Sequence, residues 1–187
     1  MRPNTLIACL FLLWTCATET LFAAEFAYGH INPRNPSSGE AVILRGEIRR
    51  GDYERLLSFV RKDPDRFQTN AVILASSGGD LLEAIKIADL IKATYQSVFV
   101  TFPNGPCASA CFLIYVAAVE RSATVPAVGI HRPYFGPEYF TGLTLAEAEA
   151  RHKSLFKEIR SYLEAREVPQ YLWKSVISGY AMLSPAL

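Results

Sequence analysis

The sequence predicts a single α/β domain with a mainly parallel sheet, because apolar strands and amphipathic helices alternate along it. Ala71–Ala75 is a continuous apolar run, as expected of a strand that is covered on both faces. Leu81–Ile91 follows with apolar residues at helical spacing, and Ser97–Thr101 is the next strand. The length of 187 residues suits one ordinary domain with its own core.

The other elements follow from the same periodicities and from capping residues. A short apolar strand at Ala41–Leu44 precedes a helix that begins at Asp52. Thr144 and Glu147 form a capping box, which predicts a long amphipathic helix running to about Arg166. Further predictions are a buried helix at Ser109–Val119, a strand at Val125–Ile130 and a last helix at Gln170–Ile177.

The first residues have the order of a secretory signal peptide. Arg2 supplies the positive charge, and Leu6–Trp14 is a short apolar run. Polar residues then end the run well before the roughly 20 apolar residues that a spanning helix needs. We predict a signal peptide at residues 1–24, cleaved after Ala23 or Ala24, and export to the bacterial periplasm. An uncleaved N-terminal segment is the only membrane attachment expected.

Residues 25–39 carry prolines, serines and glycine without periodicity, so we predict a leader there and a folded domain at 40–187. The formal net charge of +1 gives no reason to expect binding to nucleic acid or to a charged membrane surface. Two cysteines with one nearby histidine do not make a persuasive zinc site. No cofactor and no metal are expected.

Three short stretches hold the residues that could carry chemistry. Ser76–Gly79 joins a buried strand to a helix; its glycines either make a plain tight turn or let the backbone approach a ligand. Ser109 leads into an apolar helix, where a hydroxyl is either an N-cap or a nucleophile beside free N–H groups. His131 ends a strand and is either a structural residue or a general base.

Together, these stretches resemble the ClpP peptidase family, and in particular its exported bacterial relatives with a C-A-S-A-C serine motif. The order is a glycine pair, then A-S-A at a helix start, then I-H-x-P after a strand, within a similarity from about residue 41 to about residue 184. The resemblance implies the ClpP/crotonase fold, a repeated β-β-α spiral with a long helix on its C-terminal side. It also implies Ser109 as nucleophile, His131 as base, and an oxyanion hole at Gly78, Gly79 and the N–H of Ala110.

One member of the family's catalytic triad has no counterpart at its usual place. The family carries an aspartate well after the histidine, before a phrase that corresponds to Met182–Ser184, but no aspartate follows His131 and the nearby residue is Tyr180. Glu138 or Glu167 could take the place of this aspartate only by approaching His131 from a different part of the fold. Loss of the orienting carboxylate can cost about 10⁴ in rate in a serine protease.

Cys107 and Cys111 are the cysteines that remain after signal cleavage. Four residues apart in a helix, they would lie on one face with Cα atoms about 6 Å apart, which is within disulfide range. Export permits such a bond. The alternative is that two small buried thiols simply pack beside the serine turn.

The leading hypothesis is a serine peptidase, a hydrolase that uses a Ser-His pair on a peptide or protein substrate and needs no ATP, since the chain has no ATP-binding motif. The alternative is a catalytically weak or inactive ClpP-like protein that binds peptides or partners. A crotonase-type thioester enzyme is the third candidate. The long helix after Thr144 resembles the helix by which ClpP rings stack, which implies a homo-oligomer. The family's chains also continue past the position of Leu187.

Overall fold

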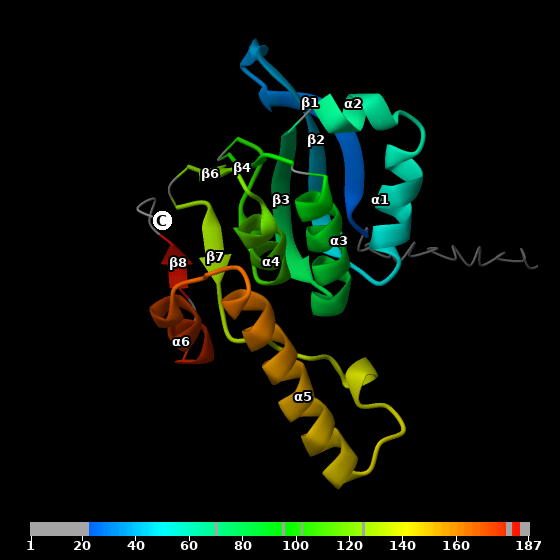
Figure 1. The fold of residues 1–187 in the computed structure, drawn as a ribbon, viewed down its shortest axis with the longest axis vertical. Coiled ribbons are helices and arrows are strands. Elements are labelled where there is room, and N and C mark those ends of the chain that lie inside the picture. The colour runs from blue at the N-terminus through cyan, green and yellow to red at the C-terminus, as the bar shows by residue number, and fades with distance from the viewer. Residues whose placement is uncertain are drawn as a thin grey trace, which may run out of the picture.

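The computed structural model describes residues 23–69, 71–94, 96–101, 103–124, 126–178 and 181–183. The described chain forms a sheet with strand order β1-β2-β3-β4-β6 and a smaller sheet with order β5-β7-β8 (Figure 1). The strands are β1 (Glu25–Asn32), β2 (Asn35–Ile48), β3 (Ala71–Gly79), β4 (Val98–Val100), β5 (Cys107–Ala108), β6 (Arg121–Ala123), β7 (Val128–Ile130) and β8 (Ala181–Leu183).

Parallel pairing dominates both sheets. β2, β3, β4 and β6 run parallel to their neighbours, and so do β5 and β7. Only the outer strands β1 and β8 pair in the antiparallel sense among the described strands. Helices connect the parallel strands, because a parallel pair needs a long crossover between the end of one strand and the start of the next. The predicted α/β class with a mainly parallel sheet is confirmed.

The helices are α1 (Asp52–Val60), α2 (Pro64–Thr69), α3 (Leu81–Ala93), α4 (Ala110–Ala117), the 3-10 turn η1 (Pro137–Tyr139), α5 (Leu145–Glu164) and α6 (Gln170–Ser178). α4 is apolar all round, every one of its residues is buried, and it packs against α3 and β3. Among the described residues, none of the helices combines the length and apolar character that crossing a bilayer requires.

The predicted long helix is α5, and it begins at the predicted capping box. The Glu147 N–H donates to Thr144 Oγ1 at 3.4 Å, and the Thr144 N–H donates to Glu147 Oε2 at 2.8 Å. The reciprocal bonds satisfy N–H groups that a helix start leaves without intrahelical acceptors. In Figure 1, α5 leads away from the two sheets toward the lower edge of the view.

The prediction of an irregular leader at residues 25–39 is wrong. These residues form β1 and the first part of β2, an antiparallel hairpin in which Tyr28 pairs with Val42. Phe26 and Tyr28 face Phe59 of α1, with ring centroids 6.3 and 5.0 Å apart. Two aromatic side chains are too few to show the alternation of apolar and polar residues that predicts a strand. The strand β1 forms because it pairs with β2 and packs its aromatic side chains against α1.

Smaller differences concern where strands begin and end. β3 continues through the predicted turn to Gly79, because Gly78 and Gly79 still pair with Glu47 and Ile48 of β2. The strand predicted at Val125–Ile130 begins at Val128. β6 was missed, since its sequence, Arg-Ser-Ala, carries no apolar pattern and its pairing with β4 alone defines it.

Candidate active site

Ser109 occupies a strained turn between a strand and a helix. The strand β5 ends at Ala108 and α4 begins at Ala110, and between them Ser109 has φ 56° and ψ −124°. Residues other than glycine rarely adopt a positive φ, because the conformation strains the backbone. Such strain persists only where the surrounding structure enforces it, and it is often found at functional sites. A serine on a sharp strand-to-helix turn is the arrangement that exposes the nucleophile in many hydrolases.

Two backbone hydrogen bonds hold this turn. The Ser109 N–H donates to the Gly129 carbonyl of β7 at 3.0 Å, and the Phe112 N–H donates to the Ser109 carbonyl at 3.0 Å. Within the described residues, the Ser109 hydroxyl makes no capping hydrogen bond to the first turn of α4. The N-cap interpretation of this serine therefore has no support, and the half-buried hydroxyl is available for other chemistry.

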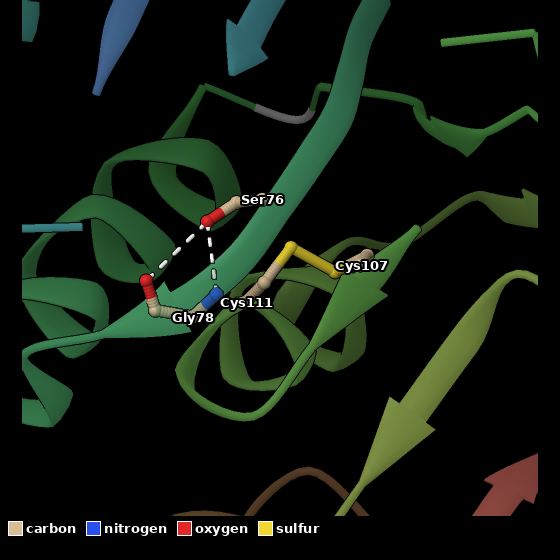
Figure 2. The surroundings of a disulfide bond; sticks show 4 residues. All are labelled: Ser76, Gly78, Cys107 and Cys111. Atoms are coloured by element: carbon tan, nitrogen blue, oxygen red, sulfur yellow. Dashed lines mark hydrogen bonds between the residues drawn. A yellow bond between two sulfur atoms is a disulfide. The ribbon is translucent and has the colours of Figure 1, made fainter. Parts of the chain in front are cut away.

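A disulfide spans the turn. Cys107 and Cys111 are joined through their Sγ atoms, with Cα atoms 5.3 Å apart, and both residues are fully buried (Figure 2). Both were expected in one helix, but Cys107 lies in β5 and only Cys111 lies in α4. The bond consequently ties the strand before Ser109 to the helix after it.

Gly78 lies directly against the turn. A Cβ atom at Gly78 would be 2.5 Å from the Cβ atom of Ser109, 2.8 Å from the Ala108 oxygen and 2.9 Å from the Ala110 nitrogen. Its φ of 102° is likewise one that residues with a Cβ atom rarely adopt. The glycine is required here for two reasons, conformation and close approach. The structure thus brings together Gly78, Ser109 and Ala110, which come from two separate sequence motifs.

Ser76 shapes the glycine turn from inside the protein. Its buried hydroxyl oxygen accepts a hydrogen bond from the Gly78 N–H at 3.1 Å and donates a longer one to the Gly78 carbonyl at 3.5 Å (Figure 2). The Gly78 N–H is therefore already engaged. Of the predicted oxyanion set, this leaves the N–H groups of Gly79 and Ala110 as candidate donors, and that of Ala110 has no intrahelical acceptor because it belongs to the first turn of α4.

His131 follows β7, the strand that pairs with β5. Ala108 is paired with Gly129, so the residues that follow these two, Ser109 and His131 among them, leave the same edge of the small sheet. The Nδ1 atom of His131 is 2.7 Å from the Arg132 carbonyl oxygen. A carbonyl can only accept, so Nδ1 carries the proton in this bond and the Nε2 atom of the neutral ring holds the lone pair.

A cavity of about 560 Å³ adjoins the glycine turn. Its lining includes Arg49, Arg50, Gly79, Glu138 and Tyr139. Burial, and then the nearby Asp80 carboxylate, raise the pKa of Tyr139 above its usual range. The Tyr139 hydroxyl is therefore protonated, and its oxygen is buried.

The residues considered for the third triad position lie in different places. Glu138 belongs to η1 and lines the cavity beside Gly79, whereas Glu167 follows the C-terminal end of α5 with φ 54°. Tyr180 and Ser184 lie outside the described residues. Sequence reasoning missed two contributors, the Ser76 hydroxyl and the Arg132 carbonyl. Ser76 belongs to the S-S-G-G motif and could have been considered from the sequence. The Arg132 carbonyl is a main-chain group, so no sequence pattern predicts its contact with His131.

We expect the Cys107–Cys111 bond to be present in protein purified without a reducing agent. Trypsin releases both cysteines in the single peptide Ala93–Arg121, which should resist alkylation before reduction; after reduction, an alkyl group should replace the hydrogen of each new thiol. Replacing both cysteines by alanine should lower the free energy of unfolding by about 2 kcal/mol, since the closed loop is short. Two freely alkylated thiols in unreduced protein would contradict this prediction.

No family model matches the chain, and no curated protein matches it. Among solved structures, the chain is similar to a mutant of the 1510-N membrane-bound stomatin-specific protease. The two share 17% sequence identity and a TM-score of 0.44, over 73% of this chain and 75% of that chain. A likeness of this size identifies neither a family nor an activity.

Proposed function

We propose that the chain is a ClpP-like serine peptidase that acts through Ser109 and His131 without ATP. The observation that carries this proposal is the backbone of Ser109, a non-glycine residue at φ 56° between β5 and α4. A turn strained in this way is maintained by its surroundings, and here a disulfide and a glycine packed against it do so. A serine that merely capped a helix would need none of these features.

In the proposed reaction, Ser109 Oγ attacks the carbonyl carbon of a peptide bond while His131 Nε2 takes the hydroxyl proton. The tetrahedral anion that forms accepts hydrogen bonds from the N–H groups of Gly79 and Ala110. His131 then returns the proton to the departing amine, which leaves an ester on Ser109. Water, activated by the same imidazole, hydrolyses that ester and restores the serine.

The bond from His131 Nδ1 to the Arg132 carbonyl supports His131 as the base. In serine proteases a carboxylate holds this ring nitrogen, selects the tautomer and stabilises the imidazolium that forms. A carbonyl oxygen can hold the ring nitrogen and select the tautomer. It carries no full negative charge, so it stabilises the imidazolium much less than a carboxylate does. We therefore propose a slow enzyme, in which orientation is provided and most of the electrostatic stabilisation is absent.

The cavity beside Gly79 is the proposed substrate site. It lies next to one of the oxyanion donors, and it has the open, mixed polar and apolar character that an extended peptide requires. The exposed side chain of Arg50 is a group in this lining that can donate hydrogen bonds to peptide carbonyls.

Labelling with a fluorophosphonate probe tests the proposal. The probe is applied from mildly acidic to mildly basic pH, and Ser109 Oγ should displace fluoride from phosphorus. The label should appear on the tryptic peptide Ala93–Arg121, which contains Ser97 and Ser109 as its only serines. Ser97→Ala should keep the label and Ser109→Ala should lose it.

Two other outcomes would replace the proposal. If the wild-type protein takes no label across that pH range, the ClpP-like peptide- or partner-binding alternative stands in its place. If the unlabelled protein binds an acyl-CoA in equilibrium dialysis, the crotonase-type alternative is adopted instead.

A further inference from the structure

A second site lies at the N-terminal end of the described chain. The main-chain nitrogen of Ala24 is 3.1 Å from Asp52 Oδ2, and the hydrogen bond is buried. The Asp52 side chain is fully enclosed, and Ala24 is only 4% exposed and belongs to the main hydrophobic core. A carboxylate is seldom enclosed in this way unless hydrogen bonds and opposite charges compensate it.

Asp52 and Arg55 both bind Ala24. Arg55 Nη2 forms an ion pair with Asp52 Oδ1 and also donates to the Ala24 carbonyl oxygen at 2.9 Å. Ala24 is therefore bound at its nitrogen, its carbonyl oxygen and its buried methyl group. Ala23, one residue earlier, forms a parallel β-bridge with Glu47 and is only half-buried.

We propose that the chain is cleaved between Ala23 and Ala24, and that Asp52 binds the α-ammonium group of the new N-terminus. The cleaving enzyme is an endopeptidase of the signal-peptidase class, and water splits the bond, leaving a carboxylate on Ala23 and an amine on Ala24. The amine takes up a proton and becomes an ammonium ion. Its nitrogen is the atom that already lies at hydrogen-bond distance from Asp52.

The same geometry argues against cleavage one residue later. A chain that began at Glu25 would lose the Ala24 nitrogen, the carbonyl that Arg55 binds and a buried methyl group. An enclosed carboxylate would then have lost one of its donors, which is costly. The sequence leaves Ala23 and Ala24 equally open as the last residue of the signal peptide, and Asp52 distinguishes between them.

This anchor is connected to the wall of the cavity. Asp52 Oδ2 also accepts the Arg49 N–H at 2.7 Å, and Arg49 is one of the residues that line the cavity. Beside it, Glu83 Oε1 accepts the N–H groups of Gly51 and Tyr53 at 3.0 and 2.8 Å. Two enclosed carboxylates thus hold the segment between β2 and α1, and one of them reaches the N-terminus.

The ion pair predicts a pH dependence of stability. In an unfolded chain an α-amino group has a pKa of about 7.7–8.0, and the neighbouring Asp52 carboxylate should raise it in the folded protein. The contribution is then fully present below the unfolded pKa and is lost as pH rises through the folded pKa.

Other charges face the same nitrogen. Arg55 of α1 opposes the shift but is half-exposed, so solvent screens it. Glu47 and Arg49 pair with each other at 2.8 Å, and Lys86 of α3 pairs with Glu83 at 3.0 Å. Glu25, the next residue in β1, is exposed. Asp52 therefore remains the enclosed charge that the ammonium group meets directly.

N-terminal sequencing of the full chain after export in a bacterial host is the first test. We expect a sequence that begins Ala24-Glu25-Phe26. A product that begins at Glu25, or one that retains Met1, overturns the proposal. This result does not depend on whether Ser109 is catalytic, so its failure and that of the proposed peptidase are distinguishable.

The second test compares two purified chains that begin at Ala24 and at Ala23. They differ by one residue, which moves the ammonium group away from Asp52. At pH 6.5 we expect the chain that begins at Ala24 to unfold about 3–6 °C higher, and we expect the difference to vanish near pH 10. Equal unfolding temperatures at both pH values overturn the proposal. Asp52→Asn in both chains should remove the difference; if that variant does not fold, the comparison of the two wild-type chains still decides.

Discussion

Replacing Ser109 by alanine is expected to lower the rate of peptide or ester hydrolysis by about 100-fold. Removing the nucleophile of a complete triad costs about 10⁶ in rate, and a missing carboxylate already accounts for about 10⁴ of that. His131→Ala should cause the same loss. The double variant should be no slower than either single variant, since the two residues act as one unit. Single-turnover ester hydrolysis with purified protein measures all three.

Stability provides the control for this series. Alanine, like serine, has a Cβ atom, so the Ser109→Ala variant keeps the same backbone strain. Its unfolding temperature should therefore stay close to that of the wild type. Ser109→Gly should be equally inactive but more stable, by about 1 kcal/mol or more, because glycine adopts this backbone conformation without strain. A glycine variant that is less stable than the alanine variant would contradict the strained-nucleophile interpretation. So would a serine-to-alanine variant with full activity.

Replacing Gly78 by alanine is expected to disrupt the serine turn directly. The new Cβ atom would lie 2.5 Å from the Ser109 Cβ atom and within 3 Å of two backbone atoms, none of which can rotate away. Overpacking of this kind costs about 1–3 kcal/mol, and the positive φ adds about 1 kcal/mol. We expect the free energy of unfolding to fall by about 2–4 kcal/mol and fluorophosphonate labelling of Ser109 to be lost.

Gly142 offers a matched control for Gly78. It also has a positive φ, 79°, but a Cβ atom there would meet nothing within 4 Å. Gly142→Ala should therefore show the conformational cost alone, about 1 kcal/mol, with normal labelling. Urea unfolding of both variants separates the two contributions. If Gly78→Ala is no less stable than Gly142→Ala and still takes the label, the close packing of Gly78 against the serine turn is not needed for the site.

Local pattern explains the parts of the fold that were predicted correctly. The capping box at Thr144 and Glu147 needs only residues three apart, and the buried strand Ala71–Ala75 and the helix α3 need only apolar periodicity. The prediction of a leader at residues 25–39 failed because β1 has a weak pattern of its own. It is stabilised by pairing with β2 and by contact of Phe26 and Tyr28 with α1.

The candidate site divides in the same way. Ser109 at the start of a helix, His131 at the end of a strand, and the glycines between a strand and a helix could all be identified from residue type and order, but the strand β5 before Ser109 was not predicted. Ser109 and His131 leave the same edge of the small sheet because β5 and β7 pair in parallel, whereas β3 belongs to the larger sheet and Gly78 meets Ser109 through packing. The bond from Arg132 to His131 and the role of Ser76 could not be predicted, since one involves a main-chain carbonyl and the other depends on a hydroxyl turning toward Gly78.

The sequence by itself determined which residue types were available for chemistry and the order in which strands and helices carry them, because both depend on neighbours within a few positions. Only the tertiary structure decided the φ of Ser109, the path of the disulfide from β5 to α4, and the contact between Ala24 and Asp52. Each of these depends on atoms that are brought together by packing. Asp52 looked like an ordinary helix-start aspartate in the sequence; enclosure against residues far along the chain gave its carboxylate a second role.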